Sequence, residues 1–496
     1  MKIYAKIVAL VIAVLMVACC FVACGDKPDV TTPDPGQSNT NATVKDDLPE
    51  GLNFSGEKDN TITCFGRGTE PITQNEMDAP EVTNEEISDA IYYRNRDIEA
   101  RLGVKIDRIV LESTDNTAAK NAVITDVNSK LRTYDVVALP VSLNTDLTIK
   151  GMFYNVINMT NDNGGYLNLD QPWWNRNILD ELEMFDSLYI LAGDICISET
   201  RQGMGMFYNK DMYAEWYPEG EDLYQLVRDG KWTIGKLTDI VSSVWTDGNT
   251  NGVIDDGDTV GYKAELQVIT SQRSAAMDVW NYAFGIDVTT KDDDGIPQLT
   301  YYSERTIDAY KKLQDLYLST GTLCADTETT GFENGNVMFR YERIVIAEQG
   351  YRDLTFKHGV LPLPKYDEDQ EEYGGGFVNL ASVVAVEATC VQPEMISAVL
   401  ELMACGSYNT VTPIYTQIVL GLKLSEAPED AEMFRILLDS LDVSFGFIYD
   451  QQIGGIAQNW RNVTNDFAQR YGSSADKYKN NLESLIDKLE DLAFAS

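Results

Sequence analysis

The residues that most resemble a chemical site lie in one acidic loop, residues 247–258. Oxygen-bearing side chains recur at its first, third, fifth, ninth and twelfth positions, and a glycine stands at the sixth. Calcium-binding loops use this spacing, because a hard cation prefers oxygen ligands and the glycine permits the sharp turn between them. The sequence therefore predicts a structural Ca²⁺ site with these ligands: Asp247, Asn249, Asn251, Asp255 and Asp258 through their side chains, and Val253 through its backbone carbonyl.

Two departures from the standard loop leave a plain solvated turn as the alternative. The twelfth position is Asp258, where the standard loop has glutamate, and residues 259–262 favour an extended strand where a helix usually follows. A surface turn rich in Asp, Asn and Gly has the same composition. With three carboxylates and two amides as ligands, we expect weak affinity of the extracellular kind.

Aromatic residues form the second chemical signal. The chain has seven tryptophans and 26 tyrosines, and several stand beside acids or amides. Sugar rings stack on aromatic rings while sugar hydroxyls bond to carboxylates and amides, so a carbohydrate site needs both. For any single tryptophan the alternative is the hydrophobic core. The candidates for a ligand cleft, of which we expect at least one tryptophan to lie there, are Trp173, Trp174, Tyr341, Glu342 and Trp460.

Four further residues are ligand-binding candidates because they follow predicted strands. Arg67 and Thr69 follow the first predicted strand, and Asp194 and Ser198 follow residues 188–192. Ligands of open α/β sheets bind at the carboxyl ends of the strands, where these side chains would meet them. Carboxylates would accept bonds from sugar hydroxyls, and Arg67 would donate to those hydroxyls or to an acidic ligand. No dinucleotide-binding glycine motif is present there, so a nicotinamide cofactor is not indicated.

Catalytic chemistry has much less support. His358 is the single histidine, which excludes a metal site built from several histidines and nearly excludes a Ser–His–Asp triad. We expect a surface or strand-end position for it, since no G-x-S-x-G motif lies nearby. Carboxylates are abundant, but no pair stands at a separation that defines a glycosidase. We therefore expect a protein that binds and does not catalyse.

The charge balance excludes some partners. The 496 residues include 39 Lys and Arg against 78 Asp and Glu, a formal net charge of −39. Such a surface repels nucleic-acid phosphates and anionic lipid headgroups, so we expect no nucleic acid and no membrane attachment through a basic patch. Hydrophobic residues make up 44% of the chain, as in globular proteins, so most of it folds.

The N-terminal residues 1–23 predict a lipoprotein signal peptide. Lys2 and Lys6 precede an apolar run at residues 7–18 that is too short for a comfortable membrane span. The segment then ends in Phe-Val-Ala-Cys, which resembles a lipobox with Cys24 as the lipidated residue, and Cys19 and Cys20 remain alternatives. Residues 24–57 are polar and rich in Pro, Asp and Thr, as expected for a flexible tether. Five later cysteines are scattered and odd in number, so buried thiols are favoured over disulfides.

The order of predicted elements indicates an α/β fold. A strand at residues 61–65 precedes a helix that begins at a Thr83–Glu86 capping box and ends at Gly103. Strand, helix and strand patterns then follow over residues 106–140. Alternating strands and helices predict a parallel sheet with crossover helices. The middle of the chain repeats this pattern, and its last part is mostly helical.

Several short motifs occur in a characteristic order: YDVVALP, QPWWN, SLYILAGD, MFYNKDMY, DLYQLVRDGKWT, NGNVMFRYER and HGVLPLPKYD. In this order, behind a lipobox, they resemble the bacterial extracellular solute-binding proteins of ABC importers, in the branch that includes maltose- and oligosaccharide-binding proteins. The resemblance covers roughly residues 58–465. It implies two α/β lobes, joined by two or three crossing segments, that close on a ligand between them, as in periplasmic binding proteins.

The resemblance also implies a division of the chain and a function. We expect lobe 1 at residues 58–195, with 355–405 returning to it, and lobe 2 at residues 196–354, with 406–496 as a helical C-terminal part. We expect a monomer, lipid-anchored at the extracellular or periplasmic face, that passes a small polar solute to an ABC permease. A carbohydrate is favoured over a peptide or another solute. The alternatives are a secreted carbohydrate-active enzyme and a surface binding protein without a transporter.

Overall fold

A computed structural model describes most of the chain. The predicted signal peptide, Cys24 and Thr69 lie outside the described residues. Within the described part, no helix has the length and apolar character that crossing a bilayer requires. The cysteines in this part are free thiols. The described ranges are 43–67, 76–111, 115–255, 257–265, 275–325, 332–461 and 466–495.

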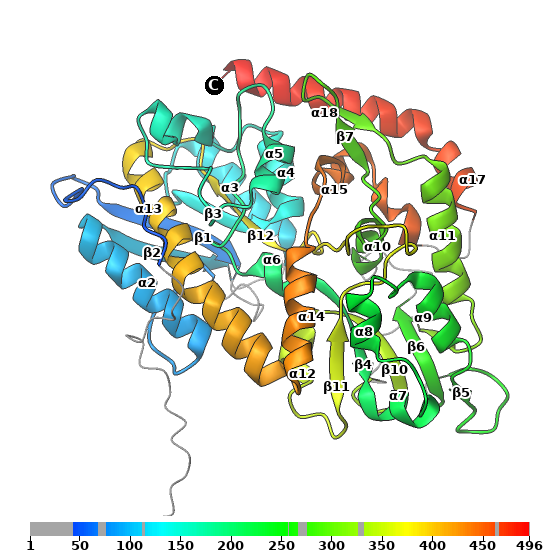
Figure 1. Ribbon diagram of the computed structural model, residues 1–496. Coiled ribbons are helices and arrows are strands. Elements are labelled where there is room, and N and C mark those ends of the chain that lie inside the picture. Colours follow the sequence, from blue (N-terminus) through cyan, green and yellow to red (C-terminus); the bar gives the residue numbers. More distant parts are fainter. Residues whose placement is uncertain are drawn as a thin grey trace, which may run out of the picture. The chain divides into compact units, whose positions relative to one another are not determined.

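The first sheet has the strand order β12-β3-β1-β2 (Figure 1). The strands β1 (Thr61–Arg67), β2 (Lys105–Leu111) and β3 (Val136–Pro140) run parallel, as the alternation of strands and helices predicts. The fourth strand, β12 (Ser382–Val386), comes from far along the sequence and pairs antiparallel with β3. Because the three parallel strands end at one edge, the residues after them meet there.

The helix α2 (Glu86–Leu102) links β1 to β2 and begins differently from the prediction. Its N-cap is Glu85, whose carboxylate accepts from the Ser88 backbone N–H, so the predicted capping box at Thr83 is wrong. The Thr83 backbone N–H instead donates to Asp89, at 2.7 Å. The predicted C-terminal glycine is correct: Gly103 has a left-handed backbone, with φ 66°, and its N–H donates to the Glu99 carbonyl.

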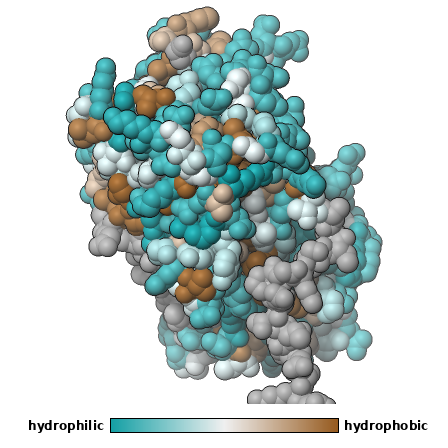
Figure 2. All heavy atoms as spheres, turned by 90° about the vertical axis from the view of Figure 1, so that its left-hand side faces the viewer, coloured by the Kyte–Doolittle hydropathy of each residue, from teal (hydrophilic) through white to brown (hydrophobic). Residues whose placement is uncertain are grey.

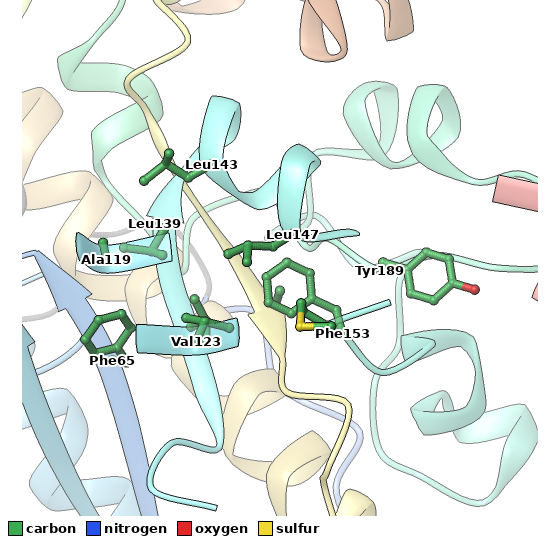
Figure 3. Packing of buried hydrophobic residues seen from close by; sticks show 11 residues of the cluster. Phe65, Ala119, Val123, Leu139, Leu143, Leu147, Phe153 and Tyr189 are labelled. Atoms are coloured by element: carbon green, nitrogen blue, oxygen red, sulfur yellow. The ribbon is translucent and has the colours of Figure 1, made fainter. Parts of the chain in front are cut away.

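A buried apolar cluster holds the first sheet to its helices (Figure 3). Ala119 and Val123 from α3 (Asn116–Ser129) pack against the strands. On the same side Leu143 and Leu147 come from α4 (Val141–Thr148). Burying a valine or leucine side chain of this kind stabilises the fold by about 1.5–3 kcal/mol. The face of the molecule in Figure 2 is mostly hydrophilic, in keeping with the charge of the chain.

The second sheet is mixed, in the order β11-β4-β10-β6-β5, and β9 pairs with β6 off this path. Its central strands, β4 and β10, pair antiparallel. His358 is the first residue of β11 and is buried against this sheet. The strand bounds are β4 (Met204–Asn209), β5 (Trp245–Thr246), β6 (Thr259–Glu265), β9 (Thr322–Ala325), β10 (Val337–Arg343) and β11 (His358–Leu361).

Crossing segments join the two sheets. The first contains α6 (Ser198–Arg201) and leads into β4. The return follows β11 and meets the first crossing where Gly203 bridges Phe377. The sequence placed residues 355–405 with the first lobe, but β11 pairs with β4, so the return to the first sheet begins only after residue 361. The hydrophobic pattern at 358–361 marks a buried strand but cannot say which sheet receives it.

The region before the first crossing also differs from the prediction. Residues 188–192 make no regular strand; Leu191 forms a single bridge with Val384. The C-terminal helices divide between the two halves. The helix α13 (Pro393–Gly406) packs on α2 beside the first sheet, whereas α14 (Pro428–Asp439) packs on β11 of the second.

Candidate functional site

A small cavity opens at the carboxyl ends of β1 and β2, where the sequence predicts ligand contacts. Its empty space is about 290 Å³, which includes open solvent. Arg67 lies in its wall, as predicted from its place after the first strand, and donates to the Asn116 side chain at 3.0 Å. Two carboxylates and a second guanidinium share the wall: Glu76, Asp78 and Arg108.

The first crossing is bonded directly to this cavity wall. The Ser198 backbone N–H donates to Glu76 Oε1 at 2.9 Å, and the Ser382 backbone N–H donates to Ser198 Oγ at 2.7 Å. Burial raises the pKa of Glu76 above the usual range of a glutamate. Ser198 itself has no exposed surface, so the structure places it in the joint between crossing and sheet and not in reach of a ligand. Its prediction as a ligand contact needs that correction.

Burial also raises the pKa of two further acids of the crossing. Burial raises the pKa of Asp194 to about 6, although the Thr412 hydroxyl donates to its carboxylate. Burial also raises the pKa of Glu199 to about 8, and the Gly193 backbone N–H donates to its Oε1 at 3.0 Å. Asp194 therefore lies at the joint, as predicted, but its carboxylate already has a partner within the protein.

An ion pair links the crossing to the second sheet, and sequence reasoning missed it. Arg201 Nη2 lies 3.1 Å from Glu348 Oε1, and both side chains are about nine-tenths buried. The Tyr415 hydroxyl donates to Glu348 Oε2 at 3.0 Å. These residues are far apart in the sequence, so no local pattern could reveal them. We call Arg67, Glu76, Ser198 and Arg201 the polar edge.

Trp173 and Trp174 are not sugar-stacking residues in this structure. Both are buried, and both indole N–H groups donate to one carboxylate, Glu401, at 3.1 and 3.0 Å. The Asn168 backbone N–H also donates to it. Burial raises the pKa of Glu401 to about 7. The two tryptophans thus hold α13 in place through Glu401. The predicted ligand role of Trp173 and Trp174 is corrected, because both side chains bond to this buried acid.

The other aromatic candidates gather beside the second sheet. Trp460 has no exposed surface and packs on Phe284, with ring centroids 5.8 Å apart. Tyr341 is 8% exposed and lies 5.0 Å from the ring of Trp280. We call these four residues the aromatic wall. None of its rings presents an open face, so the predicted stacking by Trp460 and Tyr341 requires a rearrangement of this packing.

Glu342 lies next to the aromatic wall but is already paired. Arg340 Nη2 donates to its Oε2 at 3.0 Å, and the Arg343 backbone N–H donates to its Oε1 at 2.9 Å. Arg343 in turn reaches the first crossing, where it donates to Gln202 Oε1 at 3.4 Å. The predicted carboxylate is thus at the meeting of the two halves, held by arginines.

Among the buried polar atoms that lack a hydrogen-bond partner in the part of the chain that is described are Tyr189 Oη, Gln202 Nε2, Trp280 Nε1 and Trp460 Nε1. Two of them belong to the aromatic wall, and Gln202 belongs to the first crossing. Figure 3 shows the Tyr189 hydroxyl directed away from the apolar cluster. A buried polar group left unbonded costs about 1–3 kcal/mol, which is the kind of cost that a binding site carries until its ligand arrives.

The acidic loop folds as a set of turns between β5 and β6. Asp247 accepts from the backbone N–H groups of Asn251 and Gly252, at 3.1 and 2.7 Å. Asp258 is buried and accepts from the Trp245 indole N–H at 3.1 Å. The amide nitrogens of Asn249 and Asn251 donate to Asp255. Within the described ranges, no three acidic, cysteine or histidine side chains form a group that could hold a metal ion.

Comparisons with known proteins bear on the fold. No protein-family model matches the sequence, and no curated protein matches it. The extracellular solute-binding protein from Staphylococcus aureus in complex with maltose aligns with a TM-score of 0.56 and 12% identity, over 86% of this chain and 99% of that one. The cyclic alpha-maltosyl-1,6-maltose binding protein from Arthrobacter globiformis aligns with a TM-score of 0.54 and 12% identity, over 88% and 100%.

A third similar structure binds a different kind of solute. UgpB from Mycobacterium tuberculosis, in complex with glycerophosphocholine, aligns with a TM-score of 0.52 and 13% identity, over 87% of this chain and 98% of that one. These likenesses confirm the predicted fold class, an α/β fold of the two-lobe binding-protein kind. They also show that one fold serves both a sugar and a phosphodiester, so the ligand must be argued from the site.

Proposed function

We propose that this chain is a solute-binding protein that delivers a small polar solute, most favourably a carbohydrate, to an ABC importer. The observation that carries the proposal is the fold, which solved solute-binding proteins share over 86–88% of the chain. Two sheets joined by crossing segments can rotate relative to each other, and a ligand that contacts both favours the closed arrangement.

Polar groups of the first crossing and of the aromatic wall support a polar ligand. Unbonded donors at Gln202, Trp280 and Trp460 can each bond to a hydroxyl or carbonyl oxygen once a ligand is near. Arg67 adds a guanidinium at the strand-end cavity. A sugar matches these donors through its hydroxyls. Its apolar faces would stack on the rings of the aromatic wall only after their packing rearranges, because no ring there has an open face.

A panel of ligands tests the proposal. The purified protein is heated with maltose, longer oligosaccharides, glycerophosphocholine and a short peptide, and the melting temperature is followed. A ligand at about 100 times its Kd stabilises the folded state by about 2.7 kcal/mol, an easily measured rise. The ligand is then recovered and weighed by mass spectrometry. An intact ligand supports binding; a cleaved ligand, or no response to any class, contradicts the proposal.

Variants then locate the site with whichever ligand responds. Arg67→Ala should weaken binding measured by calorimetry, because its guanidinium lies at the strand-end cavity. Lys105→Ala is the matched control, since Lys105 begins β2 at the opposite edge of the same sheet and is exposed. If the parent and Arg67→Ala bind the ligand with equal affinity, the ligand does not bind at this cavity.

We further propose that Cys24 carries a lipid anchor, with the mature chain beginning there. The sequence pattern before Cys24 supports this. Expression of the full chain in a bacterium, followed by detergent partition and mass spectrometry of the N-terminal peptide, tests it. Cys24→Ala should release the protein into the aqueous phase, whereas Cys19→Ala should not. The reverse result would assign the anchor to Cys19.

We also propose that residues 247–258 take up Ca²⁺, with the two asparagine amides turning so that their oxygens face the ion. Oxygen spacing supports this. Trp245 supplies a probe, because its indole N–H bonds to Asp258 and an excited tryptophan transfers energy to bound Tb³⁺. We expect Tb³⁺ luminescence that falls when Ca²⁺ displaces Tb³⁺ from the loop. The luminescence should be absent in Asp247→Ala. If Tb³⁺ gives no luminescence and a chelator leaves the melting curve unchanged, residues 247–258 form a plain turn and bind no Ca²⁺.

A further inference from the structure

The C-terminal helix α18 (Ala475–Ala495) is anchored on the side of the second sheet by its first half. The Asn459 side chain donates to the Tyr478 hydroxyl at 3.0 Å, and the rings of Tyr471 and Tyr478 lie 5.5 Å apart. The Asn481 side chain donates to the Ile453 carbonyl at 3.0 Å. The first half of α18 therefore has hydrogen bonds and ring contacts to hold it.

The residues under this first half belong to the second-sheet side. Phe467 of α17 (Phe467–Gly472) packs on Tyr310 of α11 (Glu304–Tyr317), with centroids 5.4 Å apart. In the same region Arg461 Nε donates to Asp278 Oδ1 at 2.8 Å. The buried Leu482 and the rings beneath it thus continue into the packing around the aromatic wall, where Trp460 also contacts Tyr310.

The other end of α18 reaches the first sheet. Leu492 packs against the apolar cluster of that sheet, which includes Met152 and Phe153. Gly151, just before them, has a left-handed backbone with φ 69°, and a Cβ built there would lie 3.2 Å from Leu492 Cδ2. A glycine at this turn therefore leaves the space that Leu492 occupies. Figure 1 shows α18 running from α17 across to the first-sheet side.

A single rigid element thus touches both halves. At 1.5 Å per residue a helix of this length spans about 31 Å. The two halves cannot move apart while both ends of α18 stay seated. The first half is held by several polar and aromatic contacts, and in the last turn Leu492 packs on the first-sheet cluster, so we take the last turn as the end that releases. Polar links also lie on this side: Lys291 Nζ donates to the Glu183 carbonyl at 2.9 Å, and the Phe445 backbone N–H donates to Glu181 Oε2 at 2.6 Å.

We propose that α18 is a releasable strap, whose last turn must leave its seat at Gly151 before the two halves separate. The strap sets how often the unliganded protein opens, and with it how fast a solute enters and leaves. This goes beyond the proposed function, because it concerns the protein without ligand and holds for any solute. Releasing one apolar side chain is a small cost, in keeping with a device that works at ambient temperature.

Small-angle X-ray scattering and hydrogen exchange on the unliganded full chain test the strap. Leu492→Ala should increase the radius of gyration and raise amide exchange at residues 149–153 by about fivefold to tenfold, since it removes the apolar contact of the last turn. Leu492→Val should give a smaller change in the same direction. Phe494→Ala is the matched control: it lies on the same turn, but its side chain is 81% exposed.

The variants give different results with and without a strap. Opening in Leu492→Ala, a graded effect in Leu492→Val and no effect in Phe494→Ala support the strap. Scattering and exchange identical to the parent in both Leu492 variants would overturn it, because α18 would then hold nothing. Loss of the cooperative fold in Leu492→Ala would also overturn it, since a strap that opens routinely cannot be required for folding. None of these results needs a ligand, so failure of the proposed function would appear separately, in the ligand panel.

Discussion

The polar edge and the aromatic wall differ in how their hydrogen-bonding groups are satisfied. The polar edge lies where the first crossing meets the strand-end cavity, and the aromatic wall packs beside the second sheet. In the polar edge, Glu76, Ser198 and Arg201 all have partners within the protein, at 2.7–3.1 Å. In the aromatic wall, packing is complete, yet the indole N–H groups of Trp280 and Trp460 have no acceptor within the described ranges. Glu76, Ser198 and Arg201 thus bond within the protein without a ligand, whereas the two indole N–H groups do not.

This difference suggests that one region recognises the ligand and that the other joins the two halves. Buried charged groups between the two halves destabilise the protein unless they are paired, and the acids of the crossing and Arg201 have partners within the protein. Leaving an indole N–H unbonded destabilises the protein less than leaving a buried charge unpaired, and the indole ring still contributes apolar packing. Ligand selectivity is therefore expected to depend more on the aromatic wall, and the stability of the closed arrangement more on the polar edge.

Truncating Trp460 gives the largest expected effect. Trp460→Ala should lower the free energy of unfolding by about 3–5 kcal/mol, because a fully buried indole leaves a large cavity. Trp460→Phe keeps one aromatic ring and removes the unbonded N–H together with the second ring of the indole, so its cost should be smaller than that of Trp460→Ala. Urea denaturation of both variants measures the difference. Equal losses in the two variants would contradict a site in which ring packing supplies most of the stability of Trp460.

Breaking the ion pair of the crossing is expected to cost somewhat less. Arg201→Ala leaves Glu348 buried without its cation and should destabilise the protein by about 3 kcal/mol. Glu348→Gln keeps a hydrogen-bond acceptor for Tyr415 and should cost less. A double variant, Arg201→Met with Glu348→Leu, should recover part of the loss, since both charges are gone. Additive losses in the double variant would show that the two side chains do not act as a pair.

The buried acids of the crossing contribute a pH dependence to the stability of the protein. Burial raises the folded pKa of Glu199 from 4.5 to about 8, so the folded state binds a proton that the unfolded state releases. The resulting stability is fully present below pH 4.5 and is lost as the pH rises towards 8, by at most about 1.4 kcal/mol per pH unit. Chemical denaturation from pH 4.5 to 8 measures this slope.

A matched variant isolates that contribution. Glu199→Gln cannot titrate, and its amide resembles the protonated acid, so the slope should become shallower. Asp194, with a folded pKa of about 6, contributes over a narrower window, and Asp194→Asn should flatten the slope only below about pH 6. A parent protein whose stability rises between pH 4.5 and 8 would contradict the assignment.

The smallest effect is expected for Glu76→Gln in the polar edge. Burial already favours the protonated form of Glu76, and a glutamine oxygen can still accept from the Ser198 N–H. We expect a loss below about 1 kcal/mol, against about 1–3 kcal/mol for Glu76→Ala, which leaves that N–H unbonded. Thermal unfolding of both variants is the measurement. A large loss in Glu76→Gln would mean that the carboxylate charge itself is needed.

Local patterns predicted local structure well. Gly103 ends α2 because a left-handed residue must follow the helix, and glycine adopts that backbone at no cost. Thr83 was wrong as the N-cap because Glu85, two residues later, also has an acceptor side chain, and spacing alone does not choose between them. Arg67 lies where the first buried strand ends, a position that its hydrophobic run marks, and it lines the cavity there; its contact with a ligand stays a prediction.

Local patterns did not predict which side chains contact one another across the fold. The sequence by itself determined the α/β alternation and the set of acids and aromatics from which a site is built, because these follow from residue type and short-range periodicity. Only the tertiary structure decided that Trp173 and Trp174 both bond to Glu401, that Arg201 pairs with Glu348, and that Leu492 seats on Gly151. Those contacts join residues more than a hundred positions apart, and their energies depend on burial, which no local window of sequence contains.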